Sequence, residues 1–246
     1  MNNNKRYEGL DIIYEDDYLL AINKPSGIHS AMLPGEKGGE SIAEILCNID
    51  DSFVEASSKA EDCGLVNRLD FETSGILVAA KEKKAWIETR ANVLAESVYK
   101  EYLCLTEGNL REEIEVDNYI GTPARRSDKV KVYKRKPRKK DRALPAKTLF
   151  SPVSYISNWG LTLVRVEIST GRRHQIRAHA AFAGYPLAGD DLYGSSVVLS
   201  EVIKKPAPKF FLHSYKMKFL HPHTKELITL EAPVPEPFRE ICEGVV

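Results

Sequence analysis

The chain has 246 residues, of which 28% are charged and 43% hydrophobic, close to the averages of soluble globular proteins. These values exclude a largely disordered chain, and no apolar run approaches the roughly 20 residues that span a bilayer. Lys+Arg and Asp+Glu both total 35, so the net charge is zero and the whole molecule exerts no strong attraction on polyanions.

The first residues and the cysteines indicate the cellular location and the domain organisation that we expect. The start, MNNNKRYEG, lacks the apolar segment of a secretory signal, so we expect a cytoplasmic protein with a polar tail at 1–9 and a single domain at 10–246. Cys47, Cys63, Cys104 and Cys242 show no ligand spacing and are too sparse for a disulfide framework. We expect reduced thiols in or near the core.

The predicted elements begin with two short strands around an acidic turn in 11–25, ended by Pro25 and Gly27. Helical spacing of apolar residues predicts a helix over 42–49, with Ser41 as its cap. Residues 75–81 predict a buried strand, followed by a helix within 82–96. Further strands are expected at 100–108, 143–153, 160–169, 209–220 and 226–233. Many strands and few helices predict an α+β fold on a mostly antiparallel sheet.

Basic residues are concentrated at 128–142, where only Asp128 and Asp141 oppose them. A solvated loop is one reading of such a run, and contact with backbone phosphates of a nucleic acid is the other. The tyrosine in the run and its position between predicted strands favour phosphate contact. The residues we expect to make it are Lys134, Arg135, Lys136, Arg138, Lys139 and Lys140.

The segment VNRLDFETSG (66–75) contains a carboxylate, Asp70, between the apolar residues Leu69 and Phe71. Arg68 and Asp70 are two residues apart and share one side of any extended stretch. A nearby guanidinium would hold Asp70 ionised, either as part of a structural ion pair or as a nucleophile or base. The decapeptide alone leaves both readings open.

Residues 170–194, TGRRHQIRAHAAFAGYPLAGDDLYG, predict a helix capped by Thr170, beginning near Arg172 and ended by Gly184 and Pro186. Arg173 and Arg177 would share one of its faces and present fixed donors to a carboxylate or phosphate. His174 and His179 are five apart, which does not put two metal ligands on one face, so we expect no metal site.

These segments resemble the RluA family of RNA pseudouridine synthases. VNRLDFETSGILVAAK (66–81), YKEYLCLTEG (99–108) and GRRHQIRAHAAFAGYPLAGDDLYG (171–194) carry the likeness, in this order and at these separations. LLAINKPSGI (19–28) and LHSYKMKFLHPHTKELITLEAPVP (212–235) extend it over roughly residues 10–238.

The resemblance implies a pseudouridine synthase fold, a central mixed and largely antiparallel sheet with a catalytic cleft, acting without cofactor or metal. It implies that Asp70 is the catalytic aspartate, that Tyr102 packs on the target base and serves as general base, and that Arg177 pairs with the aspartate. From the strand alone, Tyr102 reads as a core residue with a satisfied hydroxyl.

The resemblance also implies contacts with RNA. Arg68 would occupy the space left by a flipped base. The remaining residues of the motifs expected to contact RNA or substrate are Asn67, Thr73, Arg172, His174 and Gln175. The family has histidine at the position of Asn67 and threonine at that of Arg173, which puts details of the loop contact in doubt.

The expected activity is isomerisation of specific uridines in large-subunit ribosomal RNA or transfer RNA, by a monomer without an obligate protein partner. No RNA-binding domain of the S4 type is expected, since about ten residues precede the likeness. Two alternatives are a non-catalytic RNA-binding protein on the same fold and a carboxylate-dependent hydrolase. The latter needs two opposed carboxylates, and we interpret Asp190 and Asp191 as turn residues after the helix.

Overall fold

A computed structural model describes residues 7, 9–33, 40–94, 98–123, 127–138, 142–203 and 207–242. The chain divides into two compact units. Unit 1 comprises Met1–Val98 and Ser214–Pro233, and unit 2 comprises Tyr99–His213 and Val234–Val246. The single domain predicted for 10–246 stays a prediction.

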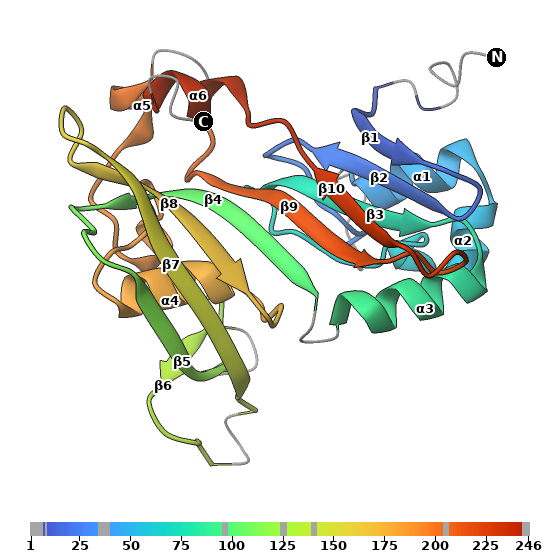
Figure 1. The fold of residues 1–246 in the computed structure, drawn as a ribbon, viewed down its shortest axis with the longest axis horizontal. Helices are drawn as coiled ribbons and strands as arrows, with labels where there is room; N and C mark the ends of the chain where they lie inside the picture. The colour runs from blue at the N-terminus through green and yellow to red at the C-terminus, as the bar shows by residue number, and fades with distance from the viewer. Residues whose placement is uncertain are drawn as a thin grey trace. The chain divides into compact units, whose positions relative to one another are not determined.

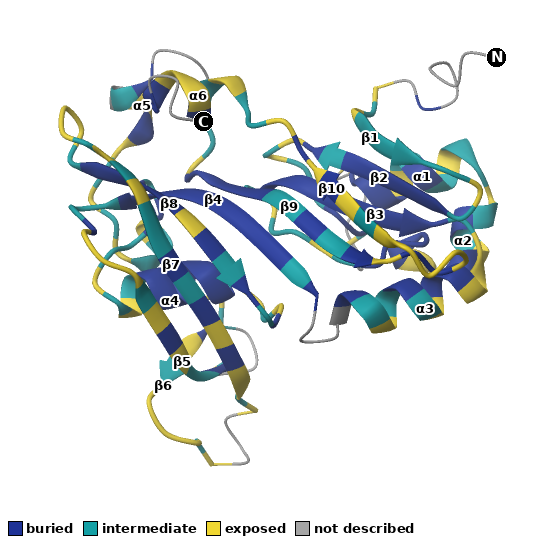
Figure 2. Cartoon of the chain, in the orientation of Figure 1, coloured by how far each residue is buried: buried dark blue, intermediate teal, exposed yellow. Residues whose placement is uncertain are grey.

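The sheet of unit 1 has the strand order β1-β2-β3-β9, with β10 paired to β9 (Figure 1). Its strands are β1 (Ile12–Glu15), β2 (Leu19–Lys24), β3 (Ser74–Ala80), β9 (Leu212–Leu220, in unit 1 from Ser214) and β10 (Leu227–Glu231). The pairs β1–β2, β2–β3 and β9–β10 are antiparallel. All seven residues of β3 are buried, as Figure 2 shows, which confirms the buried strand predicted at 75–81.

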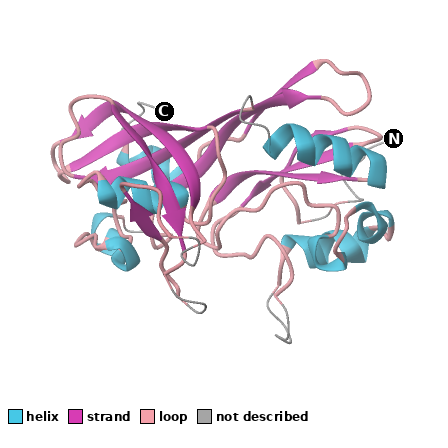
Figure 3. Ribbon diagram, turned by 90° about the horizontal axis from the view of Figure 1, so that it is seen from below, coloured by secondary structure: helices cyan, strands magenta, loops and turns pink. Residues whose placement is uncertain are grey.

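Helices cover both faces of this sheet (Figure 3). On one face, α3 (Lys83–Leu94) packs through Trp86 against alternate strand residues such as Val78. On the other, α1 (Ile42–Ile49) and α2 (Ser52–Ala56) pack against the intervening residues, including Leu77. The alternation follows from the period of two in a strand. The Ser41 side chain accepts from the backbone of Glu44, as the predicted cap requires.

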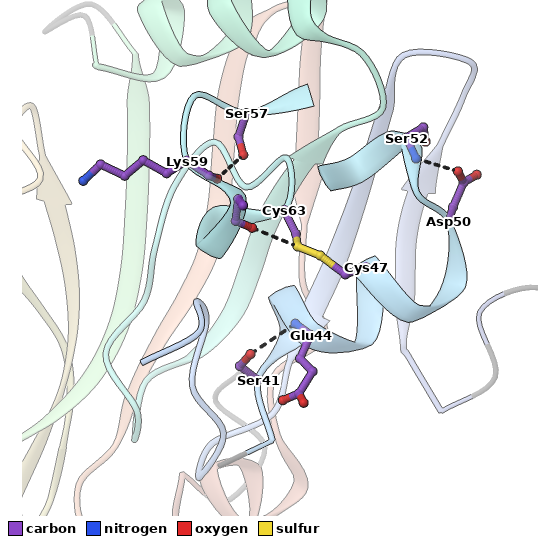
Figure 4. The surroundings of a disulfide bond; sticks show 9 residues. Ser41, Glu44, Cys47, Asp50, Ser52, Ser57, Lys59 and Cys63 are labelled. Atoms are coloured by element: carbon purple, nitrogen blue, oxygen red, sulfur yellow. Dashed lines mark hydrogen bonds between the residues drawn. A yellow bond between two sulfur atoms is a disulfide. The ribbon is translucent and has the colours of Figure 1, made fainter. Parts of the chain in front are cut away.

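A disulfide joins Cys47 of α1 to Cys63, which follows the short helix η2 (Ala60–Asp62) (Figure 4). The two Cα atoms are 6.0 Å apart, a common separation for a disulfide. The expectation of four reduced thiols is therefore wrong for this pair. Cys104 and Cys242 are free and buried, as expected.

The sheet of unit 2 has the order β4-β8-β7-β5-β6, and the pairs β4–β8, β8–β7, β7–β5 and β5–β6 are all antiparallel. Its strands are β4 (Tyr99–Glu107), β5 (Ile114–Gly121), β6 (Lys131–Tyr133), β7 (Leu144–Ile156) and β8 (Leu161–Ile168). The sequence did not predict β5 or β6. The strands and helices of the two units confirm the α+β class and the dominance of antiparallel pairing.

The helix α4 (Gln175–Phe182) packs on the sheet of unit 2 through Ala178, which contacts Ile120 of β5 and Ala146 of β7. Three shorter elements complete the described chain, namely η4 (Asp191–Tyr193), α5 (Leu199–Val202) and α6 (Glu236–Ile241). No helix in the described part of the chain is long and apolar enough to cross a membrane.

The predicted start of α4 is wrong by about three residues. Thr170 does not cap the helix, which begins at Gln175 after His174 takes a left-handed conformation with φ of 52°. Arg173 therefore precedes the helix and does not share a helical face with Arg177. The predicted end is confirmed, because Gly184 follows α4 with φ of +90°.

Candidate active site

The loop that carries Asp70 is held by hydrogen bonds from a buried lysine. Lys24, the last residue of β2, is fully buried, and its ammonium donates to the carbonyl oxygens of Pro25, Ile28 and Phe71 at 2.8, 2.9 and 3.2 Å. The backbone N–H of Gly27 donates to the same oxygen of Phe71 at 2.9 Å. These contacts fix the chain directly after Asp70.

Further hydrogen bonds fix the chain before Asp70. Ser30 Oγ donates to the carbonyl oxygen of Leu69 at 2.9 Å and accepts from its N–H at 3.0 Å. Asn67 donates to the carbonyl oxygen of Ile76 at 3.1 Å and accepts from the N–H of Val78 at 2.9 Å. The Asn67 amide thus bonds the loop to β3, while its contact with RNA stays a prediction.

The Asp70 carboxylate is half-buried and lies near a positive charge. Burial lowers the pKa of Lys24 to about 8, and the charges of Asp70 and Glu72 oppose this shift. A lysine with this pKa is still largely protonated at pH 7, so its charge favours an ionised Asp70. Lys24 was not among the predicted site residues, although a lysine that ends an apolar strand just before a proline is a visible signal in the sequence.

Two other predicted residues of this loop differ in exposure. Arg68 is exposed, and its guanidinium is open to solvent although Nη1 lies 4.0 Å from Asp62 Oδ1. Thr73 is buried, and its hydroxyl finds no hydrogen-bond partner within the described residues. The predicted contacts of both residues with RNA stay predictions.

Gly75 allows the loop to enter β3 against β9. Its φ is +105°, and a Cβ atom there would lie 2.2 Å from the carbonyl oxygen of Ser214. Only glycine fits this conformation and this approach. The turn at Thr73, Ser74 and Gly75 is therefore a packing requirement of unit 1.

In unit 2, Gln175 positions the start of α4. Its Oε1 accepts from Thr170 Oγ1 at 2.8 Å and from the N–H of Arg172 at 3.0 Å. Its Nε2 donates to the carbonyl oxygen of Lys147 at 2.9 Å and to Thr148 Oγ1 at 3.0 Å. The amide is engaged within the protein on both sides, and its contact with RNA stays a prediction.

Arg177 is buried on α4 and held in one orientation by Asp190. Its Nε and Nη2 donate to the two carboxylate oxygens of Asp190 at 2.6 and 2.8 Å. Asp190 is 1% exposed, and the Arg177 guanidinium lies over the rings of Phe210 and Tyr193, 4.4 and 5.1 Å from their centroids. A bidentate pair between aromatic rings is a rigid arrangement. Asp190 is thus more than the turn residue we interpreted it to be.

His174 and Tyr193 connect this cluster to the segment before β6. His174 Nδ1 lies 3.0 Å from Tyr193 Oη, which accepts from the N–H of Val130 at 3.0 Å. Burial, with the charges of Arg177 and Arg173, lowers the pKa of His174 to about 4. His174 is therefore neutral at pH 7, and it can hold Tyr193 without adding charge.

The basic run extends from this anchor. Arg173 donates to the carbonyl oxygens of Ser127 and Asp128, both at 3.0 Å, which ties the segment to the start of α4. Beyond β6, Lys134, Arg135, Lys136 and Arg138 are all exposed. Lys139 and Lys140 lie outside the described residues. The exposed cations form a positive surface next to α4, and their contact with phosphate stays a prediction.

The remaining candidates also have defined places. Tyr102 is 9% exposed in the middle of β4, opposite Val166 of β8. His179 is buried, with its Nδ1 2.9 Å from Thr148 Oγ1. Among the described residues, no group of three His, Cys, Asp or Glu side chains is arranged to hold a metal ion. Asp70 belongs to unit 1, and Tyr102 and Arg177 belong to unit 2, so their meeting in one site stays a prediction.

Comparison with solved structures defines the class of fold. Human RNA pseudouridylate synthase domain containing 1 matches 93% of this chain and 85% of its own, with 23% identity and a TM-score of 0.69. Human RNA pseudouridylate synthase domain containing 4 matches 96% and 92%, with 23% identity and a TM-score of 0.70. The fold is that of pseudouridine synthases.

Relatives found by sequence have a higher identity to this chain than the two solved structures. The ribosomal large subunit pseudouridine synthase C of Haemophilus ducreyi is 32% identical over 230 residues, which are 94% of this chain and 67% of that protein. An uncharacterized RNA pseudouridine synthase of Bacillus subtilis is 34% identical over 236 residues, 96% of this chain and 72% of that protein. The ribosomal large subunit pseudouridine synthase D of Nitrosomonas europaea is 30% identical over 241 residues, which are 96% of this chain and 65% of that protein.

The model of the RNA pseudouridylate synthase family matches residues 18–182. The chain therefore belongs to this family, and the predicted RluA-type resemblance is confirmed. Its activity is the isomerisation of uridine in RNA to pseudouridine, which sets aside the hydrolase alternative.

Proposed function

We propose that this enzyme isomerises specific uridines of large-subunit ribosomal RNA, with Asp70 as the catalytic carboxylate. Relatives named for the large ribosomal subunit support this substrate, and transfer RNA is the alternative. The observation that carries the proposal for Asp70 is its loop. A half-buried carboxylate stands on a backbone fixed on both sides by Lys24 and Ser30, beside a positive charge.

The reaction breaks the N1–C1′ bond, turns the base, joins C5 to C1′ and removes the C5 proton. It needs no redox step and no external nucleophile. An ionised Asp70 can add covalently to the nucleoside or remove a sugar proton to start elimination. Both routes use the same carboxylate in the same charge state.

We assign Arg177 the role of keeping Asp70 ionised and aimed, since an opposite charge within a few ångströms favours the charged form. Its bidentate bond to Asp190 supports this role, because a guanidinium fixed in orientation loses little entropy when it binds a second carboxylate. Tyr102 packs on the target base and provides a route for the C5 proton. A phenol with a pKa near 10 is a poor base at neutral pH, so packing is its primary role.

The target uridine must leave its stack to reach Asp70. Base flipping costs on the order of a few kcal/mol and costs least in loops, so we propose unpaired uridines as targets. The exposed Arg68 fills the space left by the base. The positive surface of Lys134, Arg135, Lys136 and Arg138 holds the RNA backbone, together with the charges at 139 and 140. We propose a cytoplasmic monomer that needs no protein partner.

The Asp70→Asn variant tests this proposal. It should abolish release of tritium from RNA labelled at C5 of uridine, with loss of at least about 1000-fold, while RNA binding stays within a few-fold of wild type. Filter binding and tritium release measure the two properties on the same ribosomal RNA, isolated from cells that lack the gene.

The matched control is Glu72→Gln, which removes the other carboxylate of the same loop. Glu72 accepts from Ser26 Oγ at 3.1 Å, a bond that glutamine can retain, and the variant should turn over at a rate within a few-fold of wild type. Turnover by Asp70→Asn would remove Asp70 from the central role. No tritium release from wild-type enzyme on any cellular RNA would favour the non-catalytic RNA-binding alternative.

A further inference from the structure

Lys100, the second residue of β4, is a largely buried lysine whose charge has no partner among the residues that the structure describes. The residue is 6% exposed, and within the described residues its ammonium makes no hydrogen bond and no ion pair. A lysine with so little exposed surface loses much of the hydration of its charge, and charges in such places are normally paired or bound to a ligand. Lys24, the other buried lysine with a strongly lowered pKa, has three carbonyl partners. Lys100 is thus the exception that calls for an explanation.

The acidic groups of β4 lie on the opposite face of the strand. Lys100 and Tyr102 are two residues apart and point to one side, while Tyr99 and Glu101 point to the other. Glu101 Oε1 is 3.3 Å from Arg165 Nε, so this carboxylate is already paired within the protein. The face that Lys100 shares with Tyr102 is the one proposed to meet the substrate.

The nearest charge with a resolved effect on Lys100 has the same sign. Burial, and then the positive charge of Arg172, lower the pKa of Lys100 to about 8. The Arg172 guanidinium donates from Nε to the carbonyl oxygen of Pro145 at 3.0 Å, and the backbone N–H of Arg172 donates to Gln175 Oε1 at 3.0 Å, so both its side chain and its backbone are held. The strand register brings the two residues near each other, because Glu101, next to Lys100, pairs with Glu167 of β8, and Arg172 follows the end of β8. An anion bound by both cations would relieve their repulsion.

We propose that Lys100 and Arg172 form an anion site that takes the backbone phosphate of the bound uridine nucleotide. This inference rests on the proposed function in one respect, the packing of Tyr102 on the target base. A phosphate matches two cations better than a neutral carbonyl of uracil does, because it carries a full negative charge and several acceptor oxygens. The site fixes the nucleotide by its backbone, independent of base identity.

The test is the variant Lys100→Met, which keeps the length of the apolar stem and removes the charge. Binding to ribosomal RNA isolated from cells lacking the gene should weaken about tenfold at 150 mM salt. The slope of log K against log salt should become shallower by about one, the value for one lost phosphate contact. In turnover, KM should rise and kcat should stay within a few-fold. The thermal midpoint of the free protein should equal or exceed that of wild type, because a charge that has lost much of its hydration is removed.

Two variants serve as controls. Lys100→Arg retains the charge and should restore the salt slope. Arg111→Gln removes one exposed positive charge beyond the other end of β4, and should leave the slope unchanged within error. Arg172→Gln provides an independent arm, since it should reduce the slope as Lys100→Met does even if the methionine variant folds poorly.

An unchanged affinity and salt slope for both Lys100→Met and Arg172→Gln would overturn the inference and leave Lys100 a packing residue. Weaker binding with an unchanged slope would also overturn it, because it would indicate a neutral contact such as a uracil carbonyl. These readouts measure binding, so they stand apart from the Asp70→Asn test. An active Asp70→Asn enzyme would refute the proposed catalytic residue without touching the phosphate site.

Discussion

At the scale of single residues, Asp190 determines how Arg177 is presented. Both oxygens of the Asp190 carboxylate are used by the Arg177 guanidinium, and both side chains are buried. An ion pair of this kind adds little net stability relative to an apolar pair, but the loss of one partner leaves an uncompensated buried charge. The pair is therefore sensitive to single substitutions.

The substitution Asp190→Asn should lower the free energy of unfolding by about 3 kcal/mol or more. The asparagine amide can accept only one of the two hydrogen bonds and carries no charge to balance Arg177. Urea unfolding followed by circular dichroism measures this change.

The neighbouring Asp191→Asn is the control, because Asp191 is exposed, and it should change the free energy of unfolding by no more than about 0.5 kcal/mol. Equal effects of the two substitutions would contradict a special role for Asp190. The sequence could predict that Arg177 lies on a packed helix, but no spacing rule links it to a carboxylate thirteen residues away. The chain turns at Gly184 and Gly189 before Asp190 comes back beside the arginine.

At the scale of elements, the start of α4 and the segment at 127–130 form one anchored assembly. Arg173 holds Ser127 and Asp128, and Tyr193 holds Val130. Near the other end of α4, Lys134 Nζ lies 5.6 Å from the centroid of the Phe182 ring. The positive surface after β6 is therefore attached to a packed helix at several points.

Replacing Lys134, Arg135, Lys136 and Arg138 together by glutamine should weaken RNA binding at least tenfold and flatten its salt dependence. Each lost phosphate contact lowers the slope of log K against log salt by about one. Filter binding between 50 and 300 mM salt, with the same ribosomal RNA, gives the slope.

A second variant controls for overall charge. It removes four exposed positive charges elsewhere on the chain, at Lys59, Lys83, Lys84 and Arg111. Equal slopes for the two quadruple variants would return the basic run to the solvated-loop interpretation.

The elements that the sequence predicted are those with a clear apolar pattern. The continuous apolar run of β3, the strand predicted around β2, and the helical spacing at 42–49 behind Ser41 match the structure closely. β5 was missed because Glu115, Asp117 and Asn118 hide its pattern, although Val116 and Ile120 are buried on one face. The start of α4 was misplaced because the left-handed conformation of His174 has no signal in the sequence.

At the scale of the whole molecule, the buried His179 and the half-buried His174 make stability depend on acid pH. Burial lowers the pKa of His179 from 6.5 to about 4, and the pKa of His174 is also lowered to about 4. In the unfolded chain both imidazoles take up protons near pH 6.5, whereas in the folded chain they stay neutral until about pH 4. Between these values the unfolded state binds more protons, so stability is full above pH 6.5 and falls as pH decreases toward 4.

The His179→Gln variant should lose less stability than wild type on acidification from pH 7 to pH 4.5. The difference should be at most about 3 kcal/mol, which corresponds to the change in pKa. Urea midpoints at both pH values measure it. His223→Gln is the control, since His223 is exposed and should leave the acid loss as in wild type. An identical acid loss for His179→Gln and wild type would show that other groups carry it.

The covalent link in unit 1 marks a limit of prediction from the sequence. Cys47 and Cys63 are sixteen residues apart, and only the packing of α1 beside η2 brings their Cα atoms to 6.0 Å. Composition describes the usual behaviour of a chain with few cysteines, and it is silent on which two of them the fold brings together.

The ammonium of Lys24 binds three carbonyl oxygens from separate parts of the chain. In many loops a small metal cation has this role. Because the ammonium is bonded to the chain, it cannot be chelated, exchanged or diluted away. The shape of the loop that carries Asp70 should therefore be indifferent to the ions in the medium, even though the grip on RNA depends strongly on them.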